Sequence, residues 1–372
     1  MATLILTCDT GEGHNSCAKA IKEVYDANGV QCEIINPVRF VAEWFAKFVH
    51  WTHTTMYQKH PGVFKVGYRF TQKYNNLTTK RGSFPYWVLS FGAKKLHEYI
   101  ISNQVDRIIC VHPLLMMMVS EQQRKYGLDC PVAYVSTDYT CCPGVRESHP
   151  DICFIPEITL AEEFLCENIR FSQLVASGIP VRQQFYSTVD KNEAKRQFGI
   201  PESVPNLLMM CGSMGCGPME EILDALSAES GFHITVVCGN HEALKQRLSE
   251  KYTDCSNVHI LGFVQNVSLL MDSADLFVTK PGGLSTTEGA VKCLPAVYLN
   301  AVGGCENYNL AFFVQRDCAV LADSIAHTAE LCRNLMQDPR KLETMRQALN
   351  KLQLPNASKI IYDVMNATKR KL

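Results

Sequence analysis

Short apolar runs alternate with helix-like segments along most of the chain. The apolar run at 4–8 is followed by a Gly-rich turn, by Ala18, Ile21 and Val24 at helical spacing, and by a second apolar run at 30–35. Further apolar runs stand at 107–111 and 132–136. Strands that are apolar throughout and separated by helices are typical of a parallel sheet covered on both faces. The pattern predicts an α/β domain.

The same rhythm restarts at residue 206. Apolar runs at 206–211, 233–239, 258–263 and 275–280 alternate with helical segments at 218–228, 242–252 and 267–274. The hinge is expected at 177–185, because Gly-Ile-Pro breaks both helix and strand. We therefore predict an N-terminal domain at 1–180 and a C-terminal domain at 181–354. The last helical segment, 355–372, is a candidate for packing back on the first domain.

Residues 38–96 depart from this rhythm. They hold all three tryptophans, with eleven Phe or Tyr residues and ten Lys or Arg residues against one acid, Glu43. Rings at headgroup depth and cations on lipid phosphates suit an anionic bilayer surface. We favour membrane docking through Trp44, Trp51 and Lys47. The alternatives are a helical insertion packed on its own domain and, less favoured, a single-stranded nucleic-acid surface.

The composition narrows the classes further. The chain has 372 residues and a formal net charge of −1, so no global charge favours nucleic acid. The start, MATLILTC, lacks a basic n-region, and no apolar stretch approaches the roughly 20 residues of a spanning helix. Seventeen cysteines without a C-x-x-C pair fit free thiols in a reducing cytoplasm. Metal-ligand spacing is missing, so we expect no metal site.

The first Gly-rich turn, DTGEGHNS, follows a predicted strand, at the edge where such sheets keep their ligands. Its glycines let the backbone approach a ligand, and Asn15 or Ser16 is the expected helix cap. His14 is a candidate base because imidazole accepts a proton near neutral pH; a histidine that merely caps the turn is the alternative. A dinucleotide site with Glu33 at the ribose is a weak alternative, since Ser16 replaces the third glycine.

Two glycine-rich segments mark the second half. GSMGCG, at 212–217, follows a predicted strand, and its backbone N–H groups are placed to hold a diphosphate; no Gly-Lys-Ser/Thr follows, so it is not a P-loop. In TKPGGLSTTEGA, at 279–290, Gly282 and Gly283 precede a helix that carries Glu288. A carboxylate near a helix start can accept both ribose hydroxyls, although a favourable placement in the helix dipole is the alternative. Together these features predict a nucleotide site.

Seven segments carry a family resemblance: TGEGHNSCAKA, STDY, GIPVRQQF, VVCG, LGFV, TKPGGLSTTEGA and ENYNLAFF. Over nearly its whole length the chain resembles the monogalactosyldiacylglycerol synthase and processive diacylglycerol glucosyltransferase group of family 28 glycosyltransferases. More distantly, it is similar to the N-acetylglucosaminyltransferase of peptidoglycan synthesis. The resemblance implies a GT-B fold, with two Rossmann-like domains facing a cleft. It also implies a UDP-sugar as donor substrate, without a bound cofactor.

The resemblance implies roles for particular residues. His14 is the first candidate for the catalytic base, Asp138 is the second or orients the base, and His149 is a third. Phe263 and Val264 would meet uracil, Ser213 and Met214 the diphosphate, and Glu288 the ribose. The complete set of implied nucleotide-sugar contacts is Gly13, Gly212, Ser213, Met214, Phe263, Val264, Gly282, Gly283, Glu288, Glu306 and Asn309. Relatives usually have a glutamine before the residue matching Glu306, where this chain has Cys305, so the sugar, glucose or galactose, stays open.

The activity that the resemblance implies is an inverting transfer of a hexose from UDP to diacylglycerol or another membrane lipid. Backbone donors and the helix dipole, instead of a metal, would meet the charge of the leaving UDP. We expect a cytoplasmic protein, peripheral on the inner face of the membrane. Three alternatives stay open: a polyprenyl-linked or soluble acceptor, a catalytically silent UDP-sugar-binding protein, and a UDP-sugar epimerase.

Overall fold

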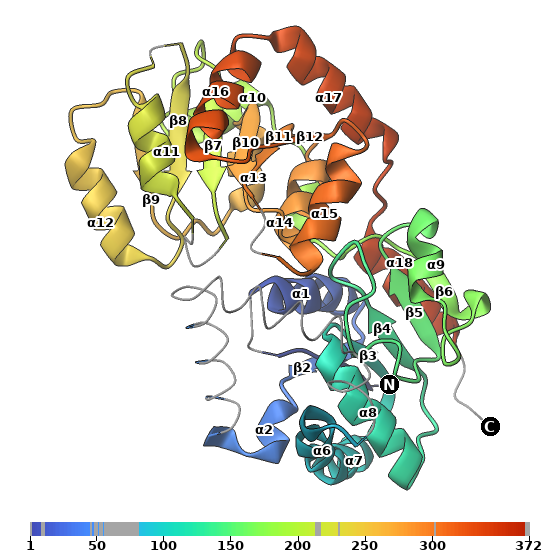
Figure 1. Cartoon of the computed structure of the whole chain (residues 1–372). Coiled ribbons are helices and arrows are strands. Elements are labelled where there is room, and N and C mark those ends of the chain that lie inside the picture. The colour runs from blue at the N-terminus through green and yellow to red at the C-terminus, as the bar shows by residue number, and fades with distance from the viewer. Residues whose placement is uncertain are drawn as a thin grey trace. The chain divides into compact units, whose positions relative to one another are not determined.

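The computed structural model describes residues 2–8, 12–44, 47, 51, 55, 82–212, 217–229, 231–300 and 303–368. The chain divides into two compact α/β units (Figure 1). The first unit comprises Met1–Gln183, Val302–Tyr308 and Pro355–Leu372. The second unit comprises Gln184–Ala301 and Asn309–Leu354.

The described residues of the first unit form a six-stranded parallel sheet of order β2-β1-β3-β4-β5-β6. Its strands are β1 (Ala2–Leu6), β2 (Gln31–Ile35), β3 (Val105–Cys110), β4 (Val132–Val135), β5 (Ile152–Ile155) and β6 (Leu174–Ala176). Successive residues of a strand point to opposite faces. Leu4 and Leu6 accordingly join one core cluster and Ile5 joins the other, so apolar layers cover both faces of the sheet.

Helices cover both faces of this sheet. They are α1 (Glu12–Ala27), α2 (Val38–Val41), α6 (Phe84–Ser90), α7 (Gly92–Ser102), α8 (Pro113–Tyr126), α9 (Ala161–Phe164) and α18 (Ala357–Ala367). The C-terminal helix α18 packs on α1, where the rings of Tyr25 and Tyr362 meet edge to face at 4.9 Å between centroids. Ile361 and Met365 of α18 are fully buried in the same cluster, so the end of the chain completes the first unit's core.

Helix α1 starts earlier than the sequence predicted. It begins at Glu12, so Asn15 and Ser16 lie inside its first turns, and the prediction that one of them caps the helix is wrong. The Asn15 side chain instead accepts a hydrogen bond from Thr7 Oγ1 at 2.9 Å. This bond ties the start of α1 to the end of β1.

The described part of the second unit also forms a six-stranded parallel sheet, of order β12-β11-β10-β7-β8-β9. Its strands are β7 (Asn206–Met210), β8 (His233–Val237), β9 (Val258–Leu261), β10 (Leu276–Thr279), β11 (Ala296–Tyr298) and β12 (Ala319–Leu321). Counted from the unit's own first strand, this is the 3-2-1-4-5-6 order of dinucleotide-binding folds.

The second unit's helices alternate with its strands. They are α10 (Lys191–Gln197), α11 (Met219–Leu226), α12 (Glu242–Lys251), α13 (Val267–Asp272), α14 (Gly283–Val291), α15 (Cys305–Val314), α16 (Ile325–Met336) and α17 (Pro339–Lys351). Helix α15 begins in the segment assigned to the first unit and continues into the second. Helix α14 begins at Gly283, so Glu288 lies in its second turn.

Each sheet has a point at which the order of its strands reverses. In the first unit it lies between β1 and β3, because α1 and α8 contribute to the core clusters on opposite faces. In the second it lies between β7 and β10. Ligands of open α/β sheets bind at the carboxyl ends of the strands beside such switch points. The segments that follow these four strands are therefore the places to look for a site.

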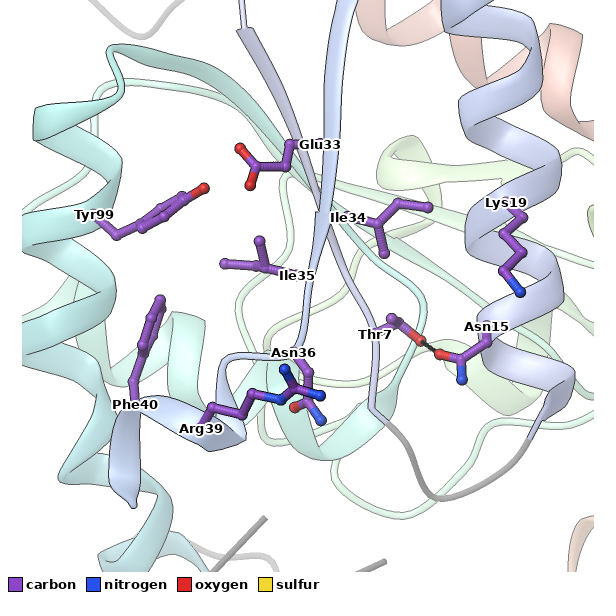
Figure 2. A pocket seen from close by; sticks show the side chains of 10 residues that line it. All are labelled: Thr7, Asn15, Lys19, Glu33, Ile34, Ile35, Asn36, Arg39, Phe40 and Tyr99. Atoms are coloured by element: carbon purple, nitrogen blue, oxygen red, sulfur yellow. Dashed lines mark hydrogen bonds between the residues drawn. The ribbon is translucent and has the colours of Figure 1, made fainter. Parts of the chain in front are cut away.

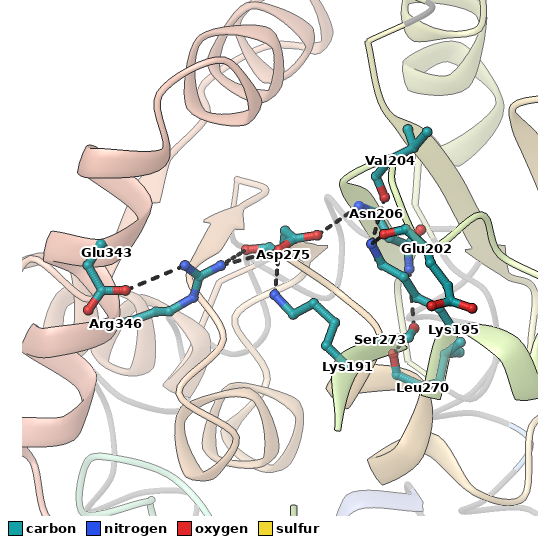
Figure 3. A network of polar contacts seen from close by, with 10 residues as sticks. All are labelled: Lys191, Lys195, Glu202, Val204, Asn206, Leu270, Ser273, Asp275, Glu343 and Arg346. Atoms are coloured by element: carbon teal, nitrogen blue, oxygen red, sulfur yellow. Dashed lines mark hydrogen bonds and ion pairs between the residues drawn. The ribbon is translucent and has the colours of Figure 1, made fainter. Parts of the chain in front are cut away.

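The opposite, amino edge of the second sheet carries a polar network. Asp275, before β10, accepts from the backbone N–H of Asn206 at 2.9 Å and pairs with Lys191 and Arg346 (Figure 3). Lys195 is buried and donates to backbone carbonyls of the segment before β7, and burial lowers the pKa of its ammonium group. These charges lie away from the carboxyl ends of the strands, so we assign them to the stability of the second unit.

Only parts of the aromatic segment 38–96 belong to the described residues: α2, α6, the first half of α7 and a few single positions that include Trp44, Lys47 and Trp51. All three of these side chains are exposed. Within the described ranges, the helices are too short or too polar to span a bilayer.

Candidate active site

His14 lies in the first turn of α1, directly after β1, at the switch point of the first unit. Its Nδ1 lies 2.8 Å from the carbonyl oxygen of Val111, which follows β3, and 3.1 Å from Thr137 Oγ1, which follows β4. A carbonyl oxygen only accepts hydrogen bonds, so Nδ1 carries the proton and Nε2 keeps its lone pair. The backbone thus selects the tautomer in which Nε2 of His14 can act as a base.

A second histidine, His112, supports this ring. The centroids of the two imidazoles lie 4.5 Å apart. His112 is buried, and its Nδ1 accepts a hydrogen bond from the backbone N–H of Leu114, which caps α8. Sequence reasoning missed His112 and Thr137. The available signal was a polar residue directly after an apolar run, which in a parallel sheet falls at the same edge as His14.

Asp138 lies beside Thr137 at this edge, while its carboxylate meets a pair of cysteines. Oδ2 of Asp138 accepts from Cys142 Sγ at 3.7 Å, and Cys142 Sγ lies 2.9 Å from Cys305 Sγ. The hydrogen bond with Cys305 and burial both raise the pKa of the Cys142 thiol well above its usual value. The structure thus places Asp138 next to a thiol pair that the sequence gave no reason to expect.

His149 is not brought to this edge. It is exposed, and its backbone N–H donates to Ser120 Oγ in the second half of α8. Two residues later, the N–H of Asp151 donates to the carbonyl of Val132, the first residue of β4. His149 therefore lies toward the amino ends of the strands, at the opposite edge of the sheet from His14, which weighs against a catalytic role.

In the second unit, the two glycine-rich turns meet at the switch point. Gly212 follows β7 with φ +73°, a conformation that favours glycine. A Cβ placed on Gly217, at the other end of that turn, would lie 3.0 Å from Cys211 Sγ and 3.6 Å from Lys280 Cε, after β10. Ser213 and Met214 lie outside the described residues. Lys280, which sequence reasoning did not assign, brings a cation to this point.

Helix α14 opens directly from the second turn. Gly282 is its N-cap, and a Cβ at Gly282 would meet nothing within 4 Å, so there is open space beside the start of the helix. Glu288 is 8 % exposed in the second turn. At its far end, the helix is anchored by a buried ion pair of 2.8 Å between Lys292 and Asp272. Such a helix start suits an anion.

Asn309 of α15 holds the PGG turn, residues 281–283, through a hydrogen bond. It is fully buried, and its Nδ2 donates to the carbonyl of Pro281 at 3.0 Å. The structure thus gives Asn309 a positioning contact with the PGG turn. Glu306 lies in the first turn of α15, directly after Cys305, and is partly exposed.

Phe263 and Val264 follow β9, at the carboxyl edge of the second sheet. Phe263 is 65 % exposed, and Val264 is partly exposed. A large exposed ring at this edge can stack on a planar base, whereas a core residue could not. The position that sequence matching assigned to uracil therefore carries an available aromatic face.

A pocket of about 410 Å³ lies in the first unit beside the start of α1 (Figure 2). Its lining combines Lys19 and Arg39 with apolar and aromatic groups such as Phe40, Ile35 and Tyr99. Burial and a hydrogen bond with Glu33 raise the pKa of Tyr99 to about 12. The volume is typical of small-molecule sites, and the mixed lining suits a molecule with one polar and one apolar end.

Exposed aromatic side chains gather at α6. Phe84, Trp87 and Phe91 are each more than half exposed, at 74 %, 54 % and 55 %. Ring centroids lie 6.0 Å apart for Phe84 and Trp87 and 4.6 Å apart for Trp87 and Phe91. The exposed Lys94 and Lys95 follow in α7. We refer to Phe84, Trp87 and Phe91 as the aromatic patch.

Two parallel six-stranded α/β sheets in one chain are the architecture of the GT-B fold. The fold matches that of MurG from Acinetobacter baumannii with a TM-score of 0.63 and 15% identity, covering 99% of this chain and 100% of that one. It also matches a UDP-GlcNAc 2-epimerase from Neisseria meningitidis, with a TM-score of 0.63, 13% identity and 99% coverage of both chains.

Sequence comparison narrows the class. The model of monogalactosyldiacylglycerol (MGDG) synthase matches residues 14–181, and the model of the glycosyltransferase family 28 C-terminal domain matches residues 206–362. Residues 206–362 thus match a family 28 glycosyltransferase domain, and residues 14–181 match the MGDG synthase model. It is 29% identical to a processive diacylglycerol beta-glucosyltransferase of Bacillus pumilus over 363 residues, which cover 97% of this chain and 93% of that protein.

Proposed function

We propose that this protein is an inverting glycosyltransferase that moves a hexose from a UDP-sugar to diacylglycerol or a related membrane lipid. The observation that carries the proposal is the His14 imidazole, held by the Val111 carbonyl at the switch point of the unit that matches MGDG synthase. Relatedness to a diacylglycerol glucosyltransferase over nearly the whole chain supports the lipid acceptor. The same relatedness favours glucose over galactose as the sugar.

In the proposed reaction, Nε2 of His14 removes the proton of the acceptor hydroxyl as the hydroxyl oxygen attacks the anomeric carbon. The bond from that carbon to the UDP oxygen breaks as the new bond forms on the opposite face, so the configuration inverts. The proton stays on His14 until it passes to solvent. The Nδ1–H bond to Val111 keeps the ring in place through both protonation states.

The leaving UDP gains negative charge, and we assign its stabilisation to the second unit. The hydrogen-bond donors to the diphosphate would be the first N–H groups of α14, whose N-cap is Gly282, and the ammonium group of Lys280. Glu288 would bind the ribose, and the Phe263 ring would stack on uracil. In this proposal the charge of the diphosphate is met without a metal ion, and Asn309 holds the turn in shape.

The pocket beside α1 supports an amphiphilic acceptor. Its lining includes Thr7, which follows β1, and Asn15 in the first turn of α1, although the His14 ring itself is not part of the lining. Its cations suit the polar end of a lipid, and its apolar and aromatic residues suit the glycerol and first acyl carbons. We propose this pocket as part of the acceptor site.

A transfer assay tests the function. Diacylglycerol vesicles are incubated with the protein and labelled UDP-glucose or UDP-galactose, and labelled lipid and free UDP are measured. We expect labelled glycolipid and stoichiometric UDP, with little UDP released without diacylglycerol. Donor binding without turnover would instead indicate a silent binding protein. A UDP-sugar converted to its epimer would indicate an epimerase, whose fold this chain shares.

We further propose that the first unit attaches to the inner face of an anionic membrane. The aromatic patch of α6 and the nearby Lys94 and Lys95, together with Trp44, Trp51 and Lys47, combine rings and cations as bilayer interfaces require. A protein that modifies diacylglycerol has to reach its acceptor in the bilayer. The exposed rings of Phe84, Trp87 and Phe91 offer the apolar contact.

Sedimentation with vesicles tests the attachment. We expect binding to vesicles that contain phosphatidylglycerol, weaker binding to phosphatidylcholine vesicles and loss of binding at high salt, because screening weakens the ionic contribution. The double variant Trp87→Ser/Phe91→Ser should bind markedly less. Phe171→Ser is the matched control, since Phe171 is an exposed aromatic residue of the same unit outside the patch. Equal loss in both variants would contradict the assignment.

A further inference from the structure

Three potential metal ligands converge in the first unit from distant parts of the chain. Asp138 and Cys142 lie in the segment after β4, and Cys305 is the first residue of α15. The two sulfur atoms lie 2.9 Å apart, and Cys142 Sγ lies 3.7 Å from Asp138 Oδ2. One ligand atom of each residue lies within 4.8 Å of the ligand atoms of the other two. Such convergence of a carboxylate and two thiols is the donor set of a soft or borderline cation.

A redox disulfide is the obvious competitor for two adjacent cysteines. Redox-active cysteines are typically accessible and held as thiolates by nearby cations. Cys142 is 7 % exposed, and among the described residues its thiol lies beside Cys305 and the carboxylate of Asp138. A carboxylate disfavours a free thiolate but becomes an additional ligand when a cation is present. The surroundings of the pair therefore favour a metal ion over oxidation.

We propose that Asp138, Cys142 and Cys305 bind one Zn²⁺ ion. Zn–S bonds of about 2.3 Å in a tetrahedron place two sulfur atoms about 3.8 Å apart, so the pair would open by roughly 1 Å on binding. The Asp138 oxygen then occupies a third position, and water completes the tetrahedron. Binding releases both thiol protons to solvent, since the thiolate is the form that ligates. The ion holds structure in place and takes no part in sugar transfer.

The consequence concerns the start of α15. Zn²⁺ would fix Cys305 to the segment after β4, and four residues later Asn309 of the same helix holds the Pro281 carbonyl of the PGG turn. Occupancy of the site would thus stiffen the helix that shapes the proposed donor site. The inference stands on the three ligands alone and does not depend on the proposed transfer reaction.

Metal binding to the whole protein tests the proposal. Reduced protein freed of metal by a chelator is titrated with Zn²⁺ against a chromophoric chelator, and with Cd²⁺ to follow the thiolate charge-transfer absorption. We expect one tight site per chain. Cys142→Ser and Cys305→Ser should each weaken Zn²⁺ binding more than the about 10- to 100-fold that loss of an outer-shell partner costs. Asp138→Asn should weaken it less, and Cys141→Ser, the neighbouring thiol, should leave it unchanged.

Hydrogen exchange gives a readout other than affinity. Since a ligand that binds only the native state stabilises it, Zn²⁺ should slow amide exchange in the first turn of α15, and Cys142→Ser should abolish that effect. Circular dichroism of the metal-free variants checks that they fold. Tight binding that survives both serine variants would overturn the proposal. A Cys142–Cys305 disulfide in protein isolated without added oxidant, or Zn²⁺ binding lost equally in Cys141→Ser, would overturn it as well.

Discussion

The two switch points of this chain differ in the groups that form them: polar side chains at one and glycine-rich turns at the other. At the first, between β1 and β3, side chains dominate: the imidazoles of His14 and His112 are 4.5 Å apart, and Thr137 lies against His14. At the second, between β7 and β10, glycines dominate: Gly212, Gly217 and Gly282 stand in the two turns without a side chain, and Lys280 adds a charge. The same sheet architecture thus carries a candidate proton acceptor in one unit and candidate hydrogen-bond donors for an anion in the other.

In the proposed function, this difference follows from what each ligand needs. A hydroxyl that must lose its proton needs one base with a defined tautomer, which the Val111 carbonyl imposes on His14. A diphosphate needs several donors at once, and a helix start with a glycine cap supplies them without a side chain in the way. The comparison predicts that substitutions at the first switch point lower the rate of sugar transfer. Substitutions at the second should instead weaken binding of the UDP-sugar.

The largest effect is expected for His14→Ala. Removal of a general base should lower kcat by about 10²- to 10⁴-fold. The affinity for UDP should stay unchanged, because the second unit provides its contacts. Turnover on diacylglycerol vesicles and calorimetry with UDP measure the two quantities. His149→Ala is the matched control and should retain activity within about twofold, since His149 lies away from the carboxyl edge. The reverse pattern would make His149 the base.

A smaller effect is expected for Glu288→Gln. Hydrogen bonds to charged groups contribute about 1.5–3 kcal/mol, so the dissociation constant for UDP should rise about 10- to 100-fold. Glu330→Gln, an exposed glutamate of α16, is the control and should bind UDP as the unchanged protein does. Unchanged UDP affinity in Glu288→Gln would remove the ribose contact from the proposal.

Acid should destabilise the second unit before the first. Burial and the neighbouring His259 lower the pKa of His233 to about 4, so between pH 6.5 and 4 the unfolded state binds a proton that the folded state does not. The free energy of unfolding therefore decreases as the pH is lowered, and at pH 5 it is roughly 2 kcal/mol smaller than at neutral pH. Hydrogen bonds from Arg124 and Lys125 lower the pKa of Glu121, in the first unit, to about 2, so its contribution is lost only below about pH 4.5.

Hydrogen exchange as a function of pH measures this order. Protection in β8 and β9 should fall between pH 6.5 and 5, while protection in α8 should persist. The variant His233→Asn should flatten the dependence in the second unit over this window. Loss of protection in α8 at the higher pH would contradict the assignment of His233 as the acid-sensitive group.

The smallest expected effect is a difference in stability between alanine variants of two glycines at the second switch point. Gly212 has φ +73°, so Gly212→Ala should lower stability by about 1 kcal/mol. Gly282 has φ −73° and open space at its Cβ position, so Gly282→Ala should change stability by less than about 0.5 kcal/mol. Gly282→Leu should fold equally well and yet lose UDP binding. Thermal unfolding with and without UDP measures both effects.

Local patterns were enough for much of the fold. The long apolar runs predicted β1 to β4 and β7 to β10, because strands covered on both faces are apolar throughout. The strands β6, β11 and β12 have only three residues each, which is too short for periodicity to identify, and the four-residue strand β5 was missed as well. Sequence also proposed His14, the PGG turn and Glu288 as candidate site residues, because each lies in or shortly after a turn that follows a predicted strand.

Tertiary structure decided the rest, because contacts between distant segments leave no local pattern. The tautomer of His14 depends on Val111, which is 97 residues away in sequence. Cys142 and Cys305 are 163 residues apart, and no pattern in either segment predicts that their thiols meet. Lys280 became a candidate site residue only because the order of the sheet puts β10 beside β7. Sequence determined which segments are strands, helices and turns, whereas strand order decided which of those turns share an edge and which side chains meet there.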